Sequence, residues 1–154
     1  MINSNRKGKV AEQDVAKVFR AMGFSVERRG LGVTGLPDLV LSYNGEPARI
    51  VVSVKNSRAV RADDLIRMSG PLYRWWIELL DEAGTRPKIL VVKFPPRLGW
   101  WIIMTERHIS LLRDYAGYAK SECSTIVIKK AWYAMPLAEF QMWATAYAMI
   151  QAWK

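Results

Sequence analysis

Three polar residues interrupt an apolar stretch of the sequence at positions that suit chemistry. Asp38 opens one apolar segment, and Ser53 and Lys55 close the next. The Asn44-Gly45 pair between the segments is a strong signal for a β-hairpin. Because strand side chains alternate between two faces, we expect Asp38, Ser53 and Lys55 to share one face of this hairpin. An acid, a hydroxyl and an ammonium group are costly to bury among apolar side chains, so they predict a site with a function.

The loop length leaves the register of this hairpin open. A two-residue loop at Asn44-Gly45 pairs Asp38 with Val51, whereas a four-residue loop over residues 44–47 pairs Asp38 with Ser53. The two registers differ by two residues, so both keep the same side chains on the same face.

A second acid is expected to approach the hairpin from a helix over residues 4–22. The apolar residues of this helix form a core-facing stripe at helical spacing: Val10, Ala11, Val15, Val18, Phe19 and Met22. Glu12 lies at the edge of the stripe. Taken alone, Glu12 is a rim residue that reaches solvent. Beside Asp38 and Lys55, it forms a two-carboxylate site of the kind that binds hydrated Mg²⁺.

The composition is that of a globular chain of single-domain size. Of the 154 residues, 51% are hydrophobic and 24% are charged, so we expect one domain over residues 1–154. The sequence contains no apolar run of the roughly 18 residues that a membrane helix needs. It does not begin with the apolar core of a signal peptide, and its single cysteine excludes an internal disulfide. These features predict a cytoplasmic protein without a membrane partner.

The formal net charge of +9 predicts a polyanionic partner, most simply nucleic acid. Three basic groups flank the predicted site along the chain: Arg6, Lys7 and Lys9, then Arg28 and Arg29, then Lys55, Arg58 and Arg61. Each group alone is ordinary solvated surface charge, but three groups around one acidic site predict contacts with a DNA backbone. Thr34, in the glycine-rich loop 30–36, could add a hydroxyl to that surface.

The order of the remaining elements indicates an α/β fold with a mixed central β-sheet flanked by helices. Strands are expected over residues 24–29, 38–43, 47–55, 89–94, 99–104 and 124–130. Helices are expected over residues 4–22, 63–83 with a break at Gly70-Pro71, 106–119, and from Pro136 to the end. The last of these is an added C-terminal helix.

These motifs, in this order, resemble the PD-(D/E)XK nucleases and most closely the archaeal-type Holliday junction resolvases. The similar segments are Arg6-Lys7-Gly8 with Glu12, Gly23-Phe24 with Arg28, Pro37-Asp38, Val91-Val92-Lys93-Phe94, and Gly99-Trp100. The resemblance covers roughly residues 5–104. It implies a restriction-endonuclease-like core at about 4–104, with a C-terminal extension at 105–154.

The resemblance also implies a structure-selective DNA endonuclease of recombination and repair, which resolves four-way junctions by hydrolysing phosphodiester bonds. Glu12, Asp38 and the Val54 carbonyl would hold Mg²⁺, for which Mn²⁺ is expected to substitute. Lys55 would position the attacking water or stabilise the developing negative charge. Cutting two strands symmetrically requires two active sites, which implies a homodimer.

One departure from the family concerns the catalytic chemistry. The family has Glu-x-Lys where this chain has Ser53-Val54-Lys55, so one acidic metal ligand is missing. Glu46, Asp63 and Asp64 are the acids that could compensate. Three interpretations stay open. The chain is an active resolvase, another PD-(D/E)XK nuclease that cuts duplex DNA, or a weakened or inactive protein that binds DNA junctions.

Overall fold

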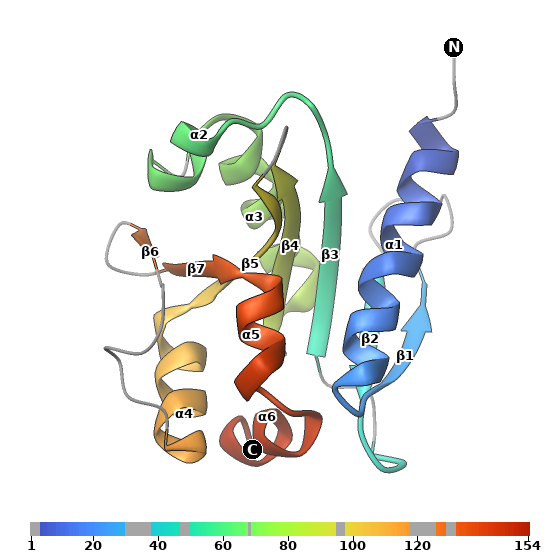
Figure 1. The fold of residues 1–154 in the computed structure, drawn as a ribbon, viewed down its shortest axis with the longest axis vertical. Helices are drawn as coiled ribbons and strands as arrows, with labels where there is room; N and C mark the ends of the chain where they lie inside the picture. Colours follow the sequence, from blue (N-terminus) through green and yellow to red (C-terminus); the bar gives the residue numbers. More distant parts are fainter. Residues whose placement is uncertain are drawn as a thin grey trace.

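The structure is a computed structural model, and it describes residues 4–29, 38–46, 50–67, 69–94, 98–117, 126–128 and 132–154. This part of the chain forms one seven-stranded sheet with the order β1-β2-β3-β4-β5-β7-β6 (Figure 1). Strands β3 and β4 run parallel, and all other neighbouring strands run antiparallel. The predicted fold class, a mixed central sheet flanked by helices, is confirmed.

The helices and strands follow the predicted order along most of the chain. They are α1 (Ser4–Ala21), β1 (Ser25–Arg28), β2 (Leu39–Ser42), β3 (Ile50–Asn56), α2 (Ala62–Arg67), α3 (Gly70–Ala83), β4 (Lys88–Phe94), β5 (Gly99–Thr105), α4 (Glu106–Ala116), β6 (Ile126–Ile128), β7 (Trp132–Pro136), α5 (Leu137–Trp143) and α6 (Ala146–Ala152). Among these helices, none combines the length and the apolar character that crossing a membrane requires.

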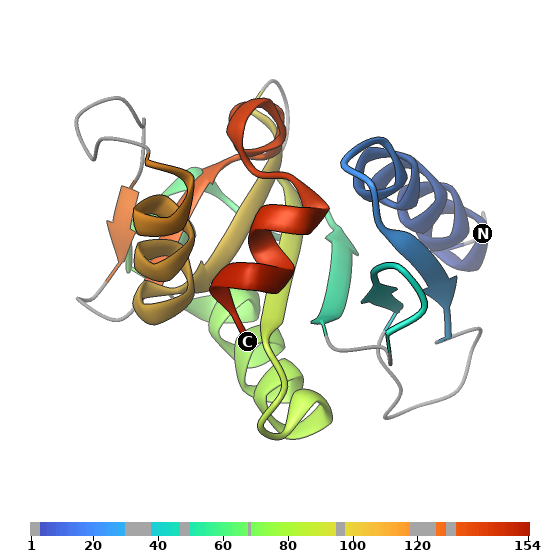
Figure 2. The same ribbon diagram turned by 90° about the horizontal axis from the view of Figure 1, so that it is seen from below.

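Helices cover both faces of the sheet (Figure 2). One core packs α1, α4, α5 and α6 against the first face, and a second core packs α2 and α3 against the other. Val52 and Val54 of β3 belong to the first core, whereas Val51 belongs to the second. Because side chains alternate along a strand, Ser53 and Lys55 lie on the face that α3 covers.

The β2–β3 hairpin combines features of both expected registers. Both residues of Asn44-Gly45 have positive φ, and the Glu46 N–H donates a 3.0 Å hydrogen bond to the Tyr43 carbonyl. These are the features of a two-residue type I′ turn. Beyond the turn, Leu41 pairs with Ile50, which is the register of the four-residue loop. The two registers differ by two residues, and an even difference leaves the facing of the side chains unchanged.

The C-terminal segment is built into the sheet. Strand β7, which was not predicted, lies between β5 and β6. The single helix expected from Pro136 to the end is a wrong prediction, because the chain forms two helices there. Ala144 is extended and ends α5, and Thr145 caps α6 by accepting a 3.1 Å hydrogen bond from the Ala148 N–H.

Candidate functional site

Asp38 stands immediately before β2 and is tied to β3. Its Oδ2 accepts a 2.7 Å hydrogen bond from the Val54 N–H and a 3.4 Å bond from the Ser53 hydroxyl. The register explains these contacts, since Leu39 pairs with Val52 and position 38 therefore lies opposite Ser53. The contacts orient one carboxylate oxygen, and no described residue donates to the other, Oδ1. Val54 reaches the site through its N–H, and a ligand role for its carbonyl stays a prediction.

Lys55 lies beyond Ser53 on the same face of β3. Its ammonium nitrogen is 5.7 Å from the ring centre of Trp75 in α3. A cation–π contact of this kind holds the ammonium group on the α3 side of the sheet without neutralising its charge. The group is therefore positioned to attract an anion that binds beside Asp38.

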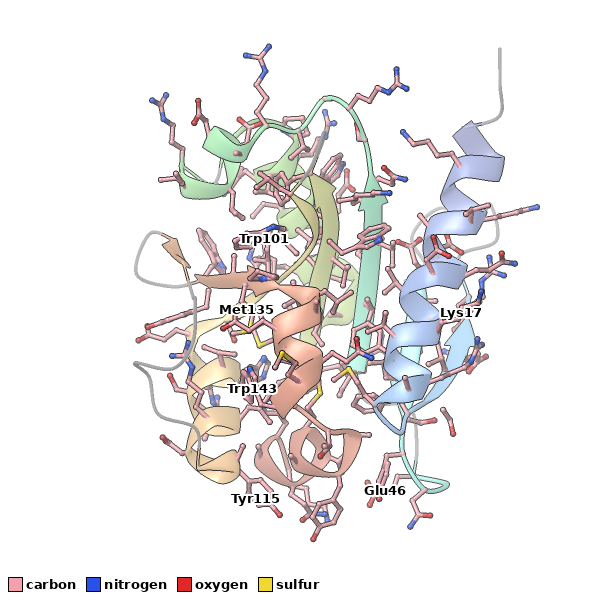
Figure 3. All side chains as sticks on the ribbon, viewed as in Figure 1. Lys17, Glu46, Trp101, Tyr115, Met135 and Trp143 are labelled. Atoms are coloured by element: carbon pink, nitrogen blue, oxygen red, sulfur yellow. The ribbon has the colours of Figure 1, made fainter. Side chains whose placement is uncertain are left out.

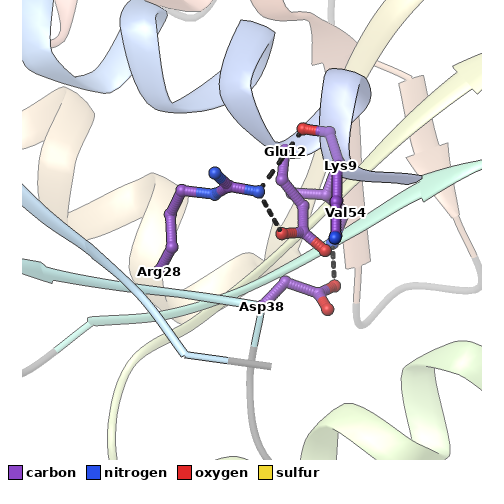
Figure 4. Close-up of polar contacts among 5 residues, drawn as sticks. All are labelled: Lys9, Glu12, Arg28, Asp38 and Val54. Atoms are coloured by element: carbon purple, nitrogen blue, oxygen red, sulfur yellow. Dashed lines mark hydrogen bonds and ion pairs between the residues drawn. The ribbon is translucent and has the colours of Figure 1, made fainter. Parts of the chain in front are cut away.

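Glu12 reaches the site from α1 (Figure 4). Its Oε2 accepts a 3.2 Å hydrogen bond from Arg28 of β1, whose guanidinium also lies 3.5 Å from the Lys9 carbonyl. The pKa of Glu12 is raised overall, chiefly by burial and also by the charge of Asp38. The hydrogen bond from Arg28 and the charge of Lys55 act in the opposite direction and lower it. In Figure 4 the Glu12 carboxylate lies between the Arg28 guanidinium and the Asp38 carboxylate. The two predicted acids are thus brought together near Lys55.

The basic residues expected to bind DNA are engaged to different degrees. Arg28 is half-buried against Glu12, whereas Arg29 is exposed and forms a 3.0 Å ion pair with Glu27. The others that can be placed are exposed: Lys7, Lys9, Arg58 and Arg61. The Arg6 side chain and Thr34 lie outside the described residues. A DNA contact by any of these residues stays a prediction.

The acids suggested as replacements for the missing glutamate lie in other surroundings. Glu46 is at the hairpin turn, at the end of the hairpin remote from Asp38 (Figure 3). Asp64 accepts hydrogen bonds from its own segment, from the Arg61 N–H at 3.0 Å and the Ser69 hydroxyl at 3.4 Å. Asp63 is exposed in the first turn of α2.

A different acid, not singled out from the sequence, lies near the site. Glu82 of α3 is half-buried, and its pKa is raised by burial and by the charges of Asp38 and Glu78 and lowered by the charge of Lys55. Its carboxylate therefore lies within electrostatic reach of both residues. Helical spacing could have associated Glu82 with Trp75, because residues two turns apart share a face. The sequence could not show that this face of α3 meets Lys55.

The donor set suits a hydrated hard cation. Mg²⁺ prefers oxygen ligands and commonly takes only one or two carboxylates, with waters completing its shell. Asp38 and Glu12 fit that requirement. Within the described ranges, no three His, Cys, Asp or Glu residues come together closely enough to hold a metal ion by themselves. The site therefore fits Mg²⁺ better than a structural Zn²⁺, whose four ligands are mostly Cys and His.

Comparisons with known proteins give little beyond this geometry. No protein-family model matches the sequence, and no curated protein matches it. Among solved structures, the chain is similar to that of Hjc, a Holliday junction resolvase from the archaeal hyperthermophile Archaeoglobus fulgidus. The two chains are 15% identical, the match covers 91% of this chain and 92% of the other, and the TM-score is 0.43. A likeness of this strength says nothing by itself about activity, so a functional conclusion depends on the site.

Proposed function

We propose that this chain is a metal-dependent endonuclease that hydrolyses phosphodiester bonds in DNA. The observation that carries the proposal is the arrangement around Asp38. Its carboxylate is oriented by the Val54 N–H, with the Lys55 ammonium on the same strand face and the Glu12 carboxylate beside it. Carboxylates that can hold a divalent cation, next to a fixed positive charge, are the groups that phosphodiester hydrolysis requires.

Each residue has a distinct role in this proposal. Asp38 and Glu12 would hold Mg²⁺ or Mn²⁺, which when bound would acidify a water and offset charge on the phosphate. The Ser53 hydroxyl and the Val54 N–H orient Asp38. Arg28 holds Glu12 toward the site. Lys55, resting on Trp75, stabilises the negative charge that develops on the phosphate oxygens.

The substrate that we propose is a four-way DNA junction, cut by paired nicks. The motif order resembles that of junction resolvases, and exposed basic residues adjoin the elements that carry the site: Lys7, Lys9, Arg58 and Arg61. Paired nicks across a junction require two active sites related by symmetry, so we propose that the active form is a homodimer.

Ser53 favours a second candidate, a junction-binding protein with weak or no cleavage. A hydroxyl is neutral and donates its hydrogen bond to Asp38, so it adds no charge for a cation. Such a protein would still bind DNA through its net charge of +9, with an affinity that falls steeply with salt.

Cleavage of a labelled four-way junction and of a matched linear duplex in Mg²⁺ separates these functions. The native chain, Lys55→Ala and Ser53→Glu would be compared. Paired nicks in the junction alone, lost in Lys55→Ala, support a resolvase. Cleavage of the duplex as well supports a nuclease with another substrate. Cleavage only after Ser53→Glu identifies a disabled resolvase, and binding without cleavage by any variant contradicts the catalytic proposal.

A further inference from the structure

We infer that Glu82 of α3 supplies the negative charge that position 53 lacks, acting on a metal ion through the waters bound to it. The inference rests on the proposed metal-dependent function and deepens it. It assigns a role to a residue that none of the motifs of the sequence contains.

The position of α3 is the first argument. This helix covers the face of the sheet on which Ser53 and Lys55 lie, and its Trp75 ring contacts the Lys55 ammonium group. Glu82 lies two helical turns beyond Trp75 on the same side of α3. Asp81, which precedes Glu82 in the chain, is exposed, whereas Glu82 is half-buried. Of these two acids of α3, Glu82 is therefore the one turned toward the site.

The charges around the site are the second argument. Without Glu82, the negative charges of Glu12 and Asp38 are balanced by the positive charges of Arg28 and Lys55. A balanced set of charges attracts a divalent cation weakly. Glu82 makes the set net negative, and the charges of Asp38 and Lys55 act on its pKa in opposite directions.

The hydration of Mg²⁺ is the third argument. The described acids do not converge into a closed metal cage. Mg²⁺ retains several waters when it binds to proteins, and a carboxylate that does not touch the ion can accept hydrogen bonds from those waters. Glu82 is thus a positioning residue, which acts on the ion through its waters. A neutral glutamine in its place would keep the shape and lose the charge.

Calorimetric titration of the full chain with Mn²⁺ tests this role without relying on cleavage. We expect Glu82→Gln to weaken Mn²⁺ binding roughly ten- to a hundredfold, as the loss of outer-shell partners does. Asp81→Asn is the matched control, because Asp81 is exposed on α3 and its charge does not act on the pKa of Glu82, and we expect a change below about twofold, because solvent screens its charge. The exchange variant Ser53→Glu/Glu82→Gln should recover the affinity that Glu82→Gln loses.

The reference variant Asp38→Asn separates failure of this inference from failure of the proposed function. If Asp38→Asn loses Mn²⁺ binding and Glu82→Gln does not, the role of Glu82 is wrong and the metal site stands. If neither variant changes binding, or if the native chain binds no Mn²⁺, both proposals fall. If Glu82→Gln loses binding but Ser53→Glu does not restore it, Glu82 is a structural residue and the inference is overturned. Thermal unfolding verifies that each variant is folded, and Glu82→Asp, which keeps the charge, should bind if Glu82→Gln does not fold.

Discussion

The Asp38 carboxylate is bound to the backbone of the adjacent strand, with its Oδ2 2.7 Å from the nitrogen of Val54. Val54 is buried, so its N–H depends on that carboxylate for a hydrogen-bond partner. One oxygen of this side chain thus makes a structural hydrogen bond, and the other is left to take part in the proposed metal binding. Removing the side chain and removing only its charge should have different consequences.

We expect Asp38→Ala to lower the free energy of unfolding by about 1–3 kcal/mol, because the Val54 N–H loses its acceptor. Asp38→Asn retains an oxygen that can accept this hydrogen bond and should be nearly as stable as the native chain. Both variants should lose cleavage. Urea unfolding measures the difference, and equal stability of the two variants would show that the hydrogen bond contributes nothing.

Lys55 and Lys93 provide a matched pair for testing the catalytic role of an ammonium group. The Lys55 ammonium lies 5.7 Å from the Trp75 ring centre, and that of Lys93 lies 5.8 Å from the Trp100 ring centre. Each lysine therefore loses a similar cation–π contact when it is changed to alanine, about 0.5–1 kcal/mol at an exposed site. Only Lys55→Ala should slow single-turnover cleavage, by roughly a hundredfold or more. An equal loss in Lys93→Ala would assign the effect to packing.

Arg28 and Arg29 allow the same comparison for ion pairs. The Arg28–Glu12 pair is partly buried, with a 3.2 Å contact, whereas the Arg29–Glu27 pair is exposed, with a 3.0 Å contact. We expect Arg28→Ala to cost about 1.5 kcal/mol of unfolding free energy, because a charged, partly buried acceptor loses its donor. Arg29→Ala should have little measurable effect, because exposed pairs are screened by solvent. Urea unfolding at low and high salt distinguishes the two, and a larger loss for Arg29→Ala would contradict this assignment.

His108 should make the fold less stable in mild acid. Burial lowers its pKa from 6.5 to about 4, and the charges of Lys88 and Arg107 act in the same direction. Its ring packs against Trp153, with 5.0 Å between the ring centroids. Between the two pKa values the unfolded chain binds a proton that the folded chain does not, so the contribution is complete above pH 6.5 and is lost as the pH falls toward 4.

The measurement is the free energy of unfolding at pH 7.5, 5.5 and 4.5 for the native chain and for His108→Gln. Carboxylates titrate in the same range, so the difference between the two proteins is the quantity to compare. The native chain should lose more stability on acidification than the variant. Parallel pH profiles would show that His108 titrates normally in the folded chain.

Gly23 should tolerate no side chain, because two constraints act on it. Its φ is +107°, and an added Cβ would lie 3.3 Å from the Cβ of Ala146, whose N–H donates a 2.9 Å hydrogen bond to the Met22 carbonyl. Gly23→Ala should therefore destabilise the chain by about 1–2 kcal/mol. Gly8, inside α1 with no atom near an added Cβ, is the control, and Gly8→Ala should stabilise the chain by about 0.5–1 kcal/mol. Thermal unfolding of the two variants gives the sign of each change.

Most elements were predictable because their signals are local. The helical stripe along α1, the turn at Asn44-Gly45 and the break at Gly70-Pro71 each depend on residues close together in the chain. Val10 was wrongly included in that stripe, because it is exposed near the start of α1. Strand β7 was missed because its place depends on pairing with β5 and β6, which no short segment reveals. The break between α5 and α6 was missed because helical spacing of apolar residues continues through Ala144 although its backbone is extended.

The residues of the candidate site also fall into those that the sequence could predict and those that only packing brings together. Alternation along two strands was enough to put Asp38, Ser53 and Lys55 on one face, because either register of the hairpin preserves their facing. The residues that surround them could not be inferred from the chain alone. Arg28 meets Glu12 because β1 packs beneath α1. Glu82 comes within electrostatic reach of Asp38 because burial of Leu72, Trp76 and Leu79 sets the rotation of α3 on the sheet. Packing of distant segments against one core sets these relations, and the spacing of residues along the chain does not encode them.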